Sequence, residues 1–243
     1  MSDPLRPAFY ALRPGGWRDY VTLLHPPYTA WHLSYVAIGA ALAPHVETWP
    51  LVGALGAFGL ALGVGAHALD EFQGRPLGTR IPGPVLVALA AVSIGGAVAI
   101  GIVSALAFTF WLLPFVAVGG LLVVAYNLEL AGGRFHSDAW FAVSWGGLPV
   151  ISAYLAQTGR VDAPAVLAAG FAVLLSAAQR VLSTEVRELR RGAVPVEGAA
   201  VLAGGQGVEL DRDSALRGRE AALRALAAAV VLLAAALLVL RLA

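Results

Sequence analysis

The sequence predicts an all-α fold, a polytopic bundle of about seven transmembrane helices, and two observations lead to this prediction. Hydrophobic residues make up 59% of the 243 residues and charged residues only 13%, whereas a soluble domain carries charge at about a quarter of its positions. Mean hydropathy is correspondingly high, at +0.78. Apolar segments of about 20 residues, long enough to cross the hydrocarbon core of a bilayer, recur from Tyr28 to the C-terminus.

These apolar segments define the spans and their connections. The predicted spans are residues 28–46, 50–69, 84–105, 108–127, 138–157, 164–183 and 216–241. Residues 1–27 form a surface segment that lacks the basic, apolar and small-residue order of a cleaved signal peptide. Residues 28–243 form the membrane domain, in which a connection at about 187–212, arginine-rich and then glycine-rich, is predicted to be a mobile loop. Asp213 and Ser214 can cap the last helix.

Arginine supplies all the basic residues and is distributed unequally between alternate loops. Of the 16 basic residues, only Arg160 and Arg241 fall on one side of the predicted membrane, and all the others fall on the opposite side. Cytoplasmic loops carry an excess of basic residues. We therefore expect the N-terminal segment and the 187–212 loop in the cytoplasm, in a bacterial or archaeal cell membrane.

The sequence lacks the residues that several kinds of chemistry require. The chain contains no cysteine, which excludes disulfides and thiolate metal sites. It contains no Walker loop, HExxH motif or nucleophile elbow. A net charge of +1 gives no sign of a nucleic-acid partner.

A first polar cluster stands at the end of the second span. His67, Asp70 and Glu71 are spaced i, i+3 and i+4, so on a helix their side chains share one face, and Arg75 follows them. Ionisable groups facing the interior of a membrane bundle are costly to keep and indicate function. The alternative is that these charges are the wetted start of a loop.

A second polar cluster ends the sixth span and falls on the same side of the membrane. Thr184 and Glu188 are an i, i+4 pair, with Glu185 between them. Carboxylates of this kind suit Mg²⁺, which binds through a few carboxylates together with the phosphates of a substrate. Arginines could hold the other phosphate oxygens, and the candidates are Arg75, Arg80, Arg134 and Arg180. The alternative is a solvated helix end with intrahelical ion pairs.

Four motifs, in this order, resemble the UbiA superfamily of intramembrane prenyltransferases over about residues 20–192. They are HPPYTAWHLSYVAIGAALA, HALDEFQGRPLGT at the end of the second span, AYNLELAGGRF, and SWGGLPVISAYLA. In that family two Asp-rich motifs bind Mg²⁺ together with a prenyl diphosphate. The prenyl chain lies in a lipid-open cavity, and an acceptor attacks its C1 carbon.

The resemblance implies roles for individual residues of the first motif and of the fourth span. Asp70 matches the second aspartate of the first Asp-rich motif, whereas His67 stands at the place of the leading aspartate and Gly74 at that of the third. Tyr126 and Arg134 match the tyrosine and the nearby basic residue that end the fourth helix of the family.

The second Asp-rich motif is matched less closely. Thr184 and Glu188 replace its aspartates, with Glu185 adjacent, and one helix follows the motif where typical members have three. Together the resemblance and the clusters give these predicted site residues: Asp70 and Tyr126 as catalytic residues; His67, Arg75, Arg80, Arg134 and Arg180 for substrate binding; Asp70, Glu71, Glu185 and Glu188 as Mg²⁺ ligands.

The sequence thus supports two hypotheses about function. The first is a UbiA-like membrane prenyltransferase that transfers an isoprenoid group from a prenyl diphosphate to an acceptor. The second is a non-catalytic relative that binds an isoprenoid lipid or scaffolds a partner, because Gly74 and Thr184 replace carboxylates of the motifs. A transporter ranks third, since its site would lie near the midplane of the membrane rather than at span ends.

The arginine distribution yields a test of orientation. Single cysteines introduced at Gln73 and at Gln206 should react with a membrane-impermeant thiol reagent only after the cells are opened, because both positions are predicted to face the cytoplasm. A cysteine at Arg160, on the opposite side, serves as the control that labels in intact cells. Labelling of both Gln73 and Gln206 variants from outside would overturn the predicted topology.

Overall fold

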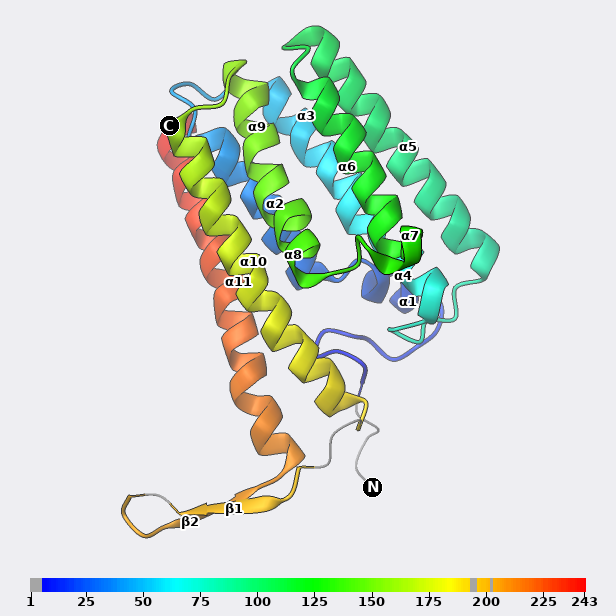
Figure 1. Cartoon of the computed structure of the whole chain (residues 1–243), viewed down its shortest axis with the longest axis vertical. Helices are drawn as coiled ribbons and strands as arrows, with labels where there is room; N and C mark the ends of the chain where they lie inside the picture. The colour runs from blue at the N-terminus through cyan, green and yellow to red at the C-terminus, as the bar shows by residue number, and fades with distance from the viewer. Residues whose placement is uncertain (1–5, 193–195, 202) are drawn as a thin grey trace.

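The chain folds as a bundle of long helices that run side by side, with a small two-stranded hairpin beyond one end (Figure 1). This is a computed structural model, and it describes residues 6–192, 196–201 and 203–243. In the chain, the hairpin lies between the last two helices. The hairpin lies beyond one end of the bundle and the C-terminus lies at the other.

The helical elements have these bounds: α1 Trp17–Leu23, α2 Pro26–Ala41, α3 Thr48–Phe58, η1 Gly59–Ala66, α4 His67–Gly74, α5 Gly83–Ala107, α6 Leu112–Asn127, α7 Leu130–Gly133, α8 Asp138–Phe141, η2 Ala142–Gly147, α9 Leu148–Thr158, α10 Ala163–Arg190 and α11 Arg212–Leu242. The segments η1 and η2 are π-helical and continuous with their α-helical neighbours. The strands are β1 Gly198–Val201 and β2 Gly207–Leu210.

Five continuous helices are long and apolar enough to cross a membrane. They are Thr48–Gly74, Gly83–Ala107, Asp138–Thr158, Ala163–Arg190 and Arg212–Leu242. The helical bundle is therefore confirmed, and the length and composition of these helices are compatible with an integral membrane protein. Two more helices, α2 and α6, overlap predicted spans but have 16 residues each, about 24 Å at 1.5 Å per residue. Their crossing of the bilayer stays a prediction.

Small residues allow the helices to approach closely, as is typical of membrane bundles. A Cβ atom on Gly39 of α2 would lie 2.3 Å from the carbonyl oxygen of Val150 on α9. A Cβ atom on Gly146 of η2 would lie 2.6 Å from the carbonyl oxygen of Ala172 on α10. The main chains of α2, α9 and α10 are thus packed directly against one another, around the buried ring of Trp31.

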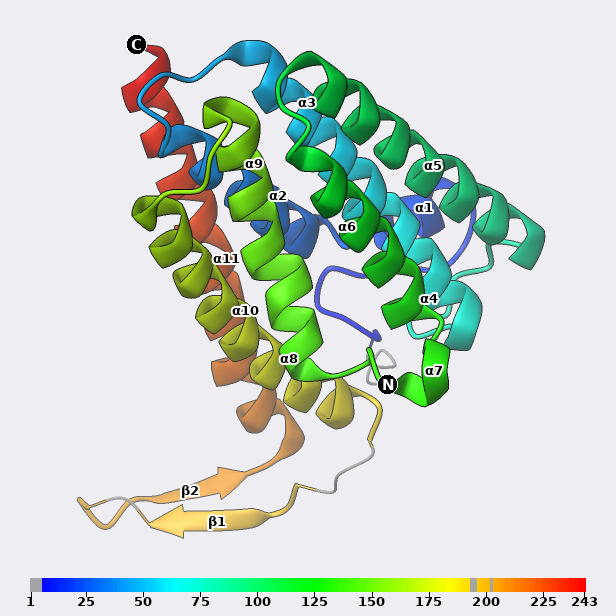
Figure 2. The same ribbon diagram turned by 45° about the horizontal axis from the view of Figure 1, so that its top comes forward.

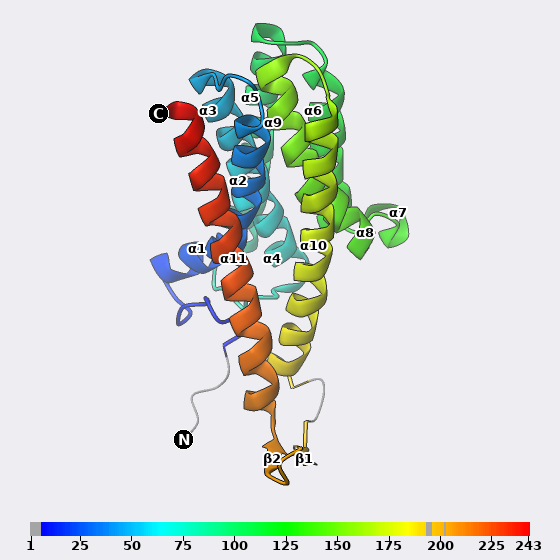
Figure 3. The same cartoon turned by 90° about the vertical axis from the view of Figure 1, so that its left-hand side faces the viewer.

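The connection between the last two long helices contains more order than the sequence predicted. Helix α10 continues to Arg190, and β1 pairs with β2 in an antiparallel hairpin whose register joins Gly198 to Leu210. The predicted mobility of this connection falls in part on residues 193–195 and 202, which lie outside the described residues. Figures 2 and 3 show the hairpin set across the end of α10 and α11.

The start of α11 corrects one expectation about capping. The N-cap is Asp211, whose carboxylate accepts from the Ser214 backbone N–H at 2.7 Å while the Ser214 hydroxyl binds the Asp211 backbone N–H. The predicted cap residue Asp213 lies instead in the first turn. The reciprocal arrangement satisfies two N–H groups at the helix start.

The close contact at Gly39 provides a stability test. Replacing it, Gly39→Ala, should lower the stability of the bundle by about 1–3 kcal/mol, because the added methyl group meets the Val150 main chain, which cannot move aside cheaply. The measurement is the apparent melting temperature of purified protein in detergent.

Gly95→Ala on α5 is the matched control, since a Cβ atom there meets no atom within 4 Å. Equal melting temperatures for the two variants would contradict the close packing of α2 on α9.

Candidate functional site

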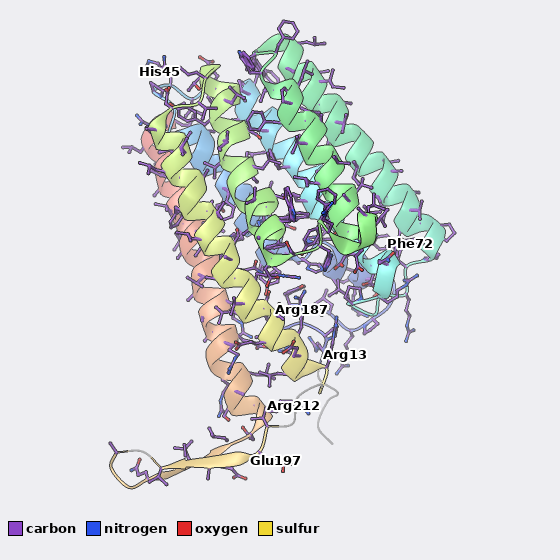
Figure 4. All side chains as sticks on the ribbon, viewed as in Figure 1. Arg13, His45, Phe72, Arg187, Glu197 and Arg212 are labelled. Atoms are coloured by element: carbon purple, nitrogen blue, oxygen red, sulfur yellow. The ribbon has the colours of Figure 1, made fainter. Side chains whose placement is uncertain are left out.

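A polar cavity of about 630 Å³ lies where α4, α6 and α10 approach the N-terminal segment. It occupies the end of the bundle nearer the hairpin, and Figure 4 shows the labelled side chain of Arg187 in this region, between α10 and the helices opposite. Residues that the sequence analysis placed in two separate clusters line this one cavity. They are His67 and Asp70 from α4, Tyr126 from α6, and Arg180, Thr184 and Glu188 from α10.

Glu71 does not belong to this cavity, which corrects its predicted role as a metal ligand. Its carboxylate is fully buried and accepts hydrogen bonds from the backbone N–H groups of Leu77 and Thr79, at 2.9 and 2.8 Å, and from the Thr79 hydroxyl at 2.9 Å. Both oxygens are therefore occupied by the loop that follows α4. Glu71 fixes this loop rather than a metal ion.

The second correction concerns Glu185. Its carboxylate forms an ion pair with Arg219 of α11 and does not line the cavity. Beside it, Arg190 donates to Glu220 at 2.6 Å, so the end of α10 and the start of α11 are joined by ion pairs. Helical geometry explains the outcome, because Glu185 lies about 100° away from Thr184 around the helix.

Three predicted phosphate-binding arginines also lie outside the cavity lining. Arg75 ends α4 in a left-handed conformation, with φ 51°, and its guanidinium donates to the carbonyl oxygens of Thr79 and Ile81. Arg80 and Arg134 are exposed. The backbone N–H of Arg80 donates to the buried carboxylate of Asp19 at 2.9 Å. These arginines shape or flank the loops around the cavity.

Arg187 is a cavity residue that the sequence analysis did not single out. Its guanidinium is half-buried and donates to the Thr184 hydroxyl at 3.0 Å. Among the described residues no carboxylate lies within ion-pair distance of it, whereas Arg180 is paired with Asp138 at 2.8 Å. The spacing 180, 184, 187, one face of a helix, is the signal that could have identified it.

Histidines form a second group that the sequence analysis left unassigned, apart from His67. His25, His32 and His136 all line the cavity with His67. The rings of His25 and His67 are stacked, with centroids 4.0 Å apart and planes inclined by 12°. His25 Nδ1 is 2.8 Å from the hydroxyl oxygen of Tyr10.

Burial shifts the pKa values of both Tyr10 and His25. Burial lowers the pKa of His25 well below its ordinary value, and the neighbouring His67 and Arg187 lower it further. Burial also raises the pKa of Tyr10 well above its ordinary value, and Tyr28 adds to this effect. Both shifts favour the neutral forms of the two groups.

The N-terminal segment covers the cavity. Residues 7–10 line it, and the segment is held by Arg190, which donates to the carbonyl oxygen of Arg6 at 2.9 Å. The guanidinium of Arg224 lies over the ring of Phe9, 4.8 Å from its centroid. The predicted surface segment is thus part of the site.

A smaller, apolar cavity of about 100 Å³ lies next to the polar one, among α3, η1, α5, α6 and α9. One cluster of apolar and aromatic residues separates the two. Its members Ala61 and Val123 line the apolar cavity, and its members Tyr126 and Trp145 line the polar one. The site therefore offers a polar chamber and an apolar chamber on either side of an aromatic layer.

The donor set of the cavity does not fit the two Mg²⁺ ions that the resemblance implies. Of the four predicted ligands, only Asp70 and Glu188 line it. No group of three or more histidine, cysteine, aspartate or glutamate side chains is arranged to hold a metal ion, among residues 6–192, 196–201 and 203–243. Two carboxylates can hold one Mg²⁺ ion when phosphate oxygens and water complete its shell.

No protein-family model, no curated protein and no solved structure matches the chain.

The buried carboxylate of Glu71 makes a stability prediction. Glu71→Gln should destabilise the protein by about 2–4 kcal/mol, because the amide carries no charge and turns N–H donors toward groups that themselves donate. Thr79→Val should cost less, about 1 kcal/mol, since it removes only the hydroxyl donor.

Melting temperatures of both variants in detergent, against wild type, provide the measurement. If Glu71→Gln has the same melting temperature as wild type, the carboxylate does not hold the loop.

Proposed function

We propose that this chain is a UbiA-like integral membrane protein that binds a prenyl diphosphate and transfers its isoprenoid group to an acceptor. One observation carries the proposal: within a bundle of membrane-spanning helices, a polar chamber with the unpaired guanidinium of Arg187 adjoins an apolar chamber. An amphiphile with an anionic head and a long apolar chain is complementary to such a pair of chambers.

In this proposal the arginines of α10 hold the diphosphate. Arg187 and Arg180 both line the cavity. A guanidinium presents a planar fork of donors that matches phosphate oxygens and remains charged at any physiological pH. Arg187 is suited to this task because it forms no ion pair with a carboxylate of the described residues. The two guanidinium groups would also stabilise the charge on the departing diphosphate.

The isoprenoid chain would enter the apolar chamber across the aromatic layer. Tyr126 and Trp145 have ring centroids 4.7 Å apart, and Phe141 is stacked on Trp145 at 5.4 Å. The faces of such rings attract cations. A C1 carbon placed beside them could therefore develop positive charge as its bond to the diphosphate breaks.

Asp70 and Glu188 are the residues that would hold a single Mg²⁺ ion. Among the described residues, neither forms a hydrogen bond or an ion pair with a side chain of the cavity. Bound there, the ion would supply charge neutralisation for the diphosphate. In this proposal the arginines bind the phosphates whether or not the metal ion is present.

A second candidate function is a non-catalytic protein that binds an isoprenoid lipid. The observation that favours it is that two predicted Mg²⁺ ligands have other partners. Glu71 binds the loop that follows α4, and Glu185 forms an ion pair with Arg219. Both candidates place the N-terminal segment in the cytoplasm and the site in a bacterial or archaeal membrane.

Titration of purified protein in detergent with geranylgeranyl diphosphate, with and without Mg²⁺, tests the proposal. Arg187→Gln should weaken binding by about tenfold to a hundredfold, the value of a charge-assisted hydrogen bond. Asp70→Asn should abolish any enhancement by Mg²⁺ while leaving the metal-free binding in place.

Arg134→Gln is the control, since Arg134 is exposed and outside the cavity lining. Saturable binding that releases no diphosphate with any acceptor favours the non-catalytic candidate. Absence of saturable binding in wild type under both conditions would refute both candidates for this ligand.

A further inference from the structure

The polar cavity concentrates histidine. The chain has five histidines, and four of them line this cavity: His25, His32, His67 and His136. The fifth, His45, is exposed in the loop before α3, and Figure 4 shows it at the opposite end of the molecule. Apart from His67, which the sequence analysis assigned to substrate binding, neither the family resemblance nor the binding of a diphosphate gives these histidines a role.

Three of these histidines make the same hydrogen bond. His32 Nδ1 lies 3.0 Å from the carbonyl oxygen of Trp145, His67 Nδ1 lies 3.1 Å from that of Gly63, and His136 Nδ1 lies 3.0 Å from that of Tyr126. A carbonyl oxygen can only accept a hydrogen bond, so in each ring Nδ1 carries the proton and donates it.

The common tautomer leaves Nε2 of each neutral ring as an acceptor. Within the described part of the chain, no donor is hydrogen-bonded to Nε2 of these three rings.

Two polar atoms of residues that line the cavity are buried without a partner among the described residues. They are the hydroxyl group of Tyr126 and Oε1 of Gln179, in side chains that are 5% and 4% exposed. Both atoms are enclosed by protein and do not face a ligand. The Nε2 atoms of the three histidines are therefore the acceptors that remain for one.

We infer that the three histidines form a binding site for a neutral molecule that donates hydrogen bonds from hydroxyl groups to Nε2 of His32, His67 and His136. The inference rests on the proposed function, in which this molecule is the acceptor of the isoprenoid group. It deepens that function by separating a histidine-lined site for the hydroxyl compound from the arginines that hold the phosphates.

Charge and geometry exclude other classes of ligand from this site. An anion without a hydroxyl or N–H group has no donor to offer to a bare Nε2. The three rings are also not arranged around a metal ion, since the described residues contain no group of three such ligands that could hold one. A hydroxyl compound satisfies the acceptors without bringing charge.

The test uses full-length protein in detergent and two matched probes. The first, 1-monoolein, is a neutral lipid with two hydroxyl groups, and the second, methyl oleate, has the same chain and no hydroxyl group. His67→Asn keeps an N–H that can donate to the Gly63 carbonyl and removes the atom at Nε2, and His32→Asn and His136→Asn do the same at their sites. His45→Asn is the control.

We expect wild type and His45→Asn to bind 1-monoolein equally. One or two of the three cavity variants should bind it about tenfold more weakly, the loss of one hydrogen bond with its partner left unpaired, because two hydroxyl groups can donate to no more than two of the Nε2 atoms. Binding of methyl oleate should be the same in all variants. Equal binding of 1-monoolein by wild type and all three cavity variants would overturn the inference.

A second measurement does not depend on the variants. In wild-type protein labelled with ¹⁵N-histidine, three histidines should show a protonated Nδ1 and an unprotonated Nε2 at neutral pH, and their Nε2 resonances should shift when 1-monoolein is added. Protonated Nε2 in these rings would overturn the inference. So would saturable binding of Zn²⁺ that the same three substitutions abolish, because Nε2 would then be a metal ligand.

Failure of this inference and failure of the proposed function give different results. If geranylgeranyl diphosphate binds in an Arg187-dependent manner and the histidine substitutions leave 1-monoolein binding unchanged, only the hydroxyl site is wrong. If the diphosphate does not bind but 1-monoolein binds in a histidine-dependent manner, the hydroxyl site stands and the prenyl diphosphate is the wrong donor.

Discussion

The carboxylate of Glu71 is the interaction on which the site depends. It is fully buried and is satisfied by two backbone N–H groups and one hydroxyl of the segment 77–79. A charge buried in this way is tolerated only when its hydrogen bonds are complete. Because Glu71 ties the end of α4 to the following loop, the adjacent Asp70 and the preceding His67 are held at the cavity. The second buried carboxylate, Asp19, binds the same loop at Arg80 and joins it to the N-terminal segment.

Much of the fold follows from the sequence because a bilayer imposes a simple rule. Backbone groups in hydrocarbon must be satisfied within the segment, so a long apolar run becomes a helix whatever its neighbours do. The helices Gly83–Ala107 and Ala163–Arg190 accordingly begin within a residue of the predicted spans. The hairpin at 198–210 escapes this rule. Its strands have four residues each, and pairing of such short strands depends on a turn rather than on an apolar pattern.

The site follows from the sequence only in part, because spacing along a helix does not say which neighbour a side chain meets. Asp70 and Glu188 reach one cavity as their positions suggested, but Glu185 meets Arg219 from a helix that begins after a long connection. The histidines were harder to assign. The tautomer of His32 is set by the carbonyl oxygen of Trp145, 113 residues away, and no pattern local to either residue encodes that contact. Only the folded arrangement distinguishes a structural histidine from one that presents Nε2.

The cavity contains groups with opposite requirements, and this has a consequence for stability. Arg187 donates to the Thr184 hydroxyl and has no carboxylate partner, while the histidine Nε2 atoms lack donors among the described residues. Direct contact between the two groups would satisfy both, yet Arg187 binds Thr184 on its own helix instead. A molecule that supplies the missing partners binds the folded state alone and therefore stabilises it. The unmet hydrogen bonds, rather than the depth of the cavity, define what this site selects.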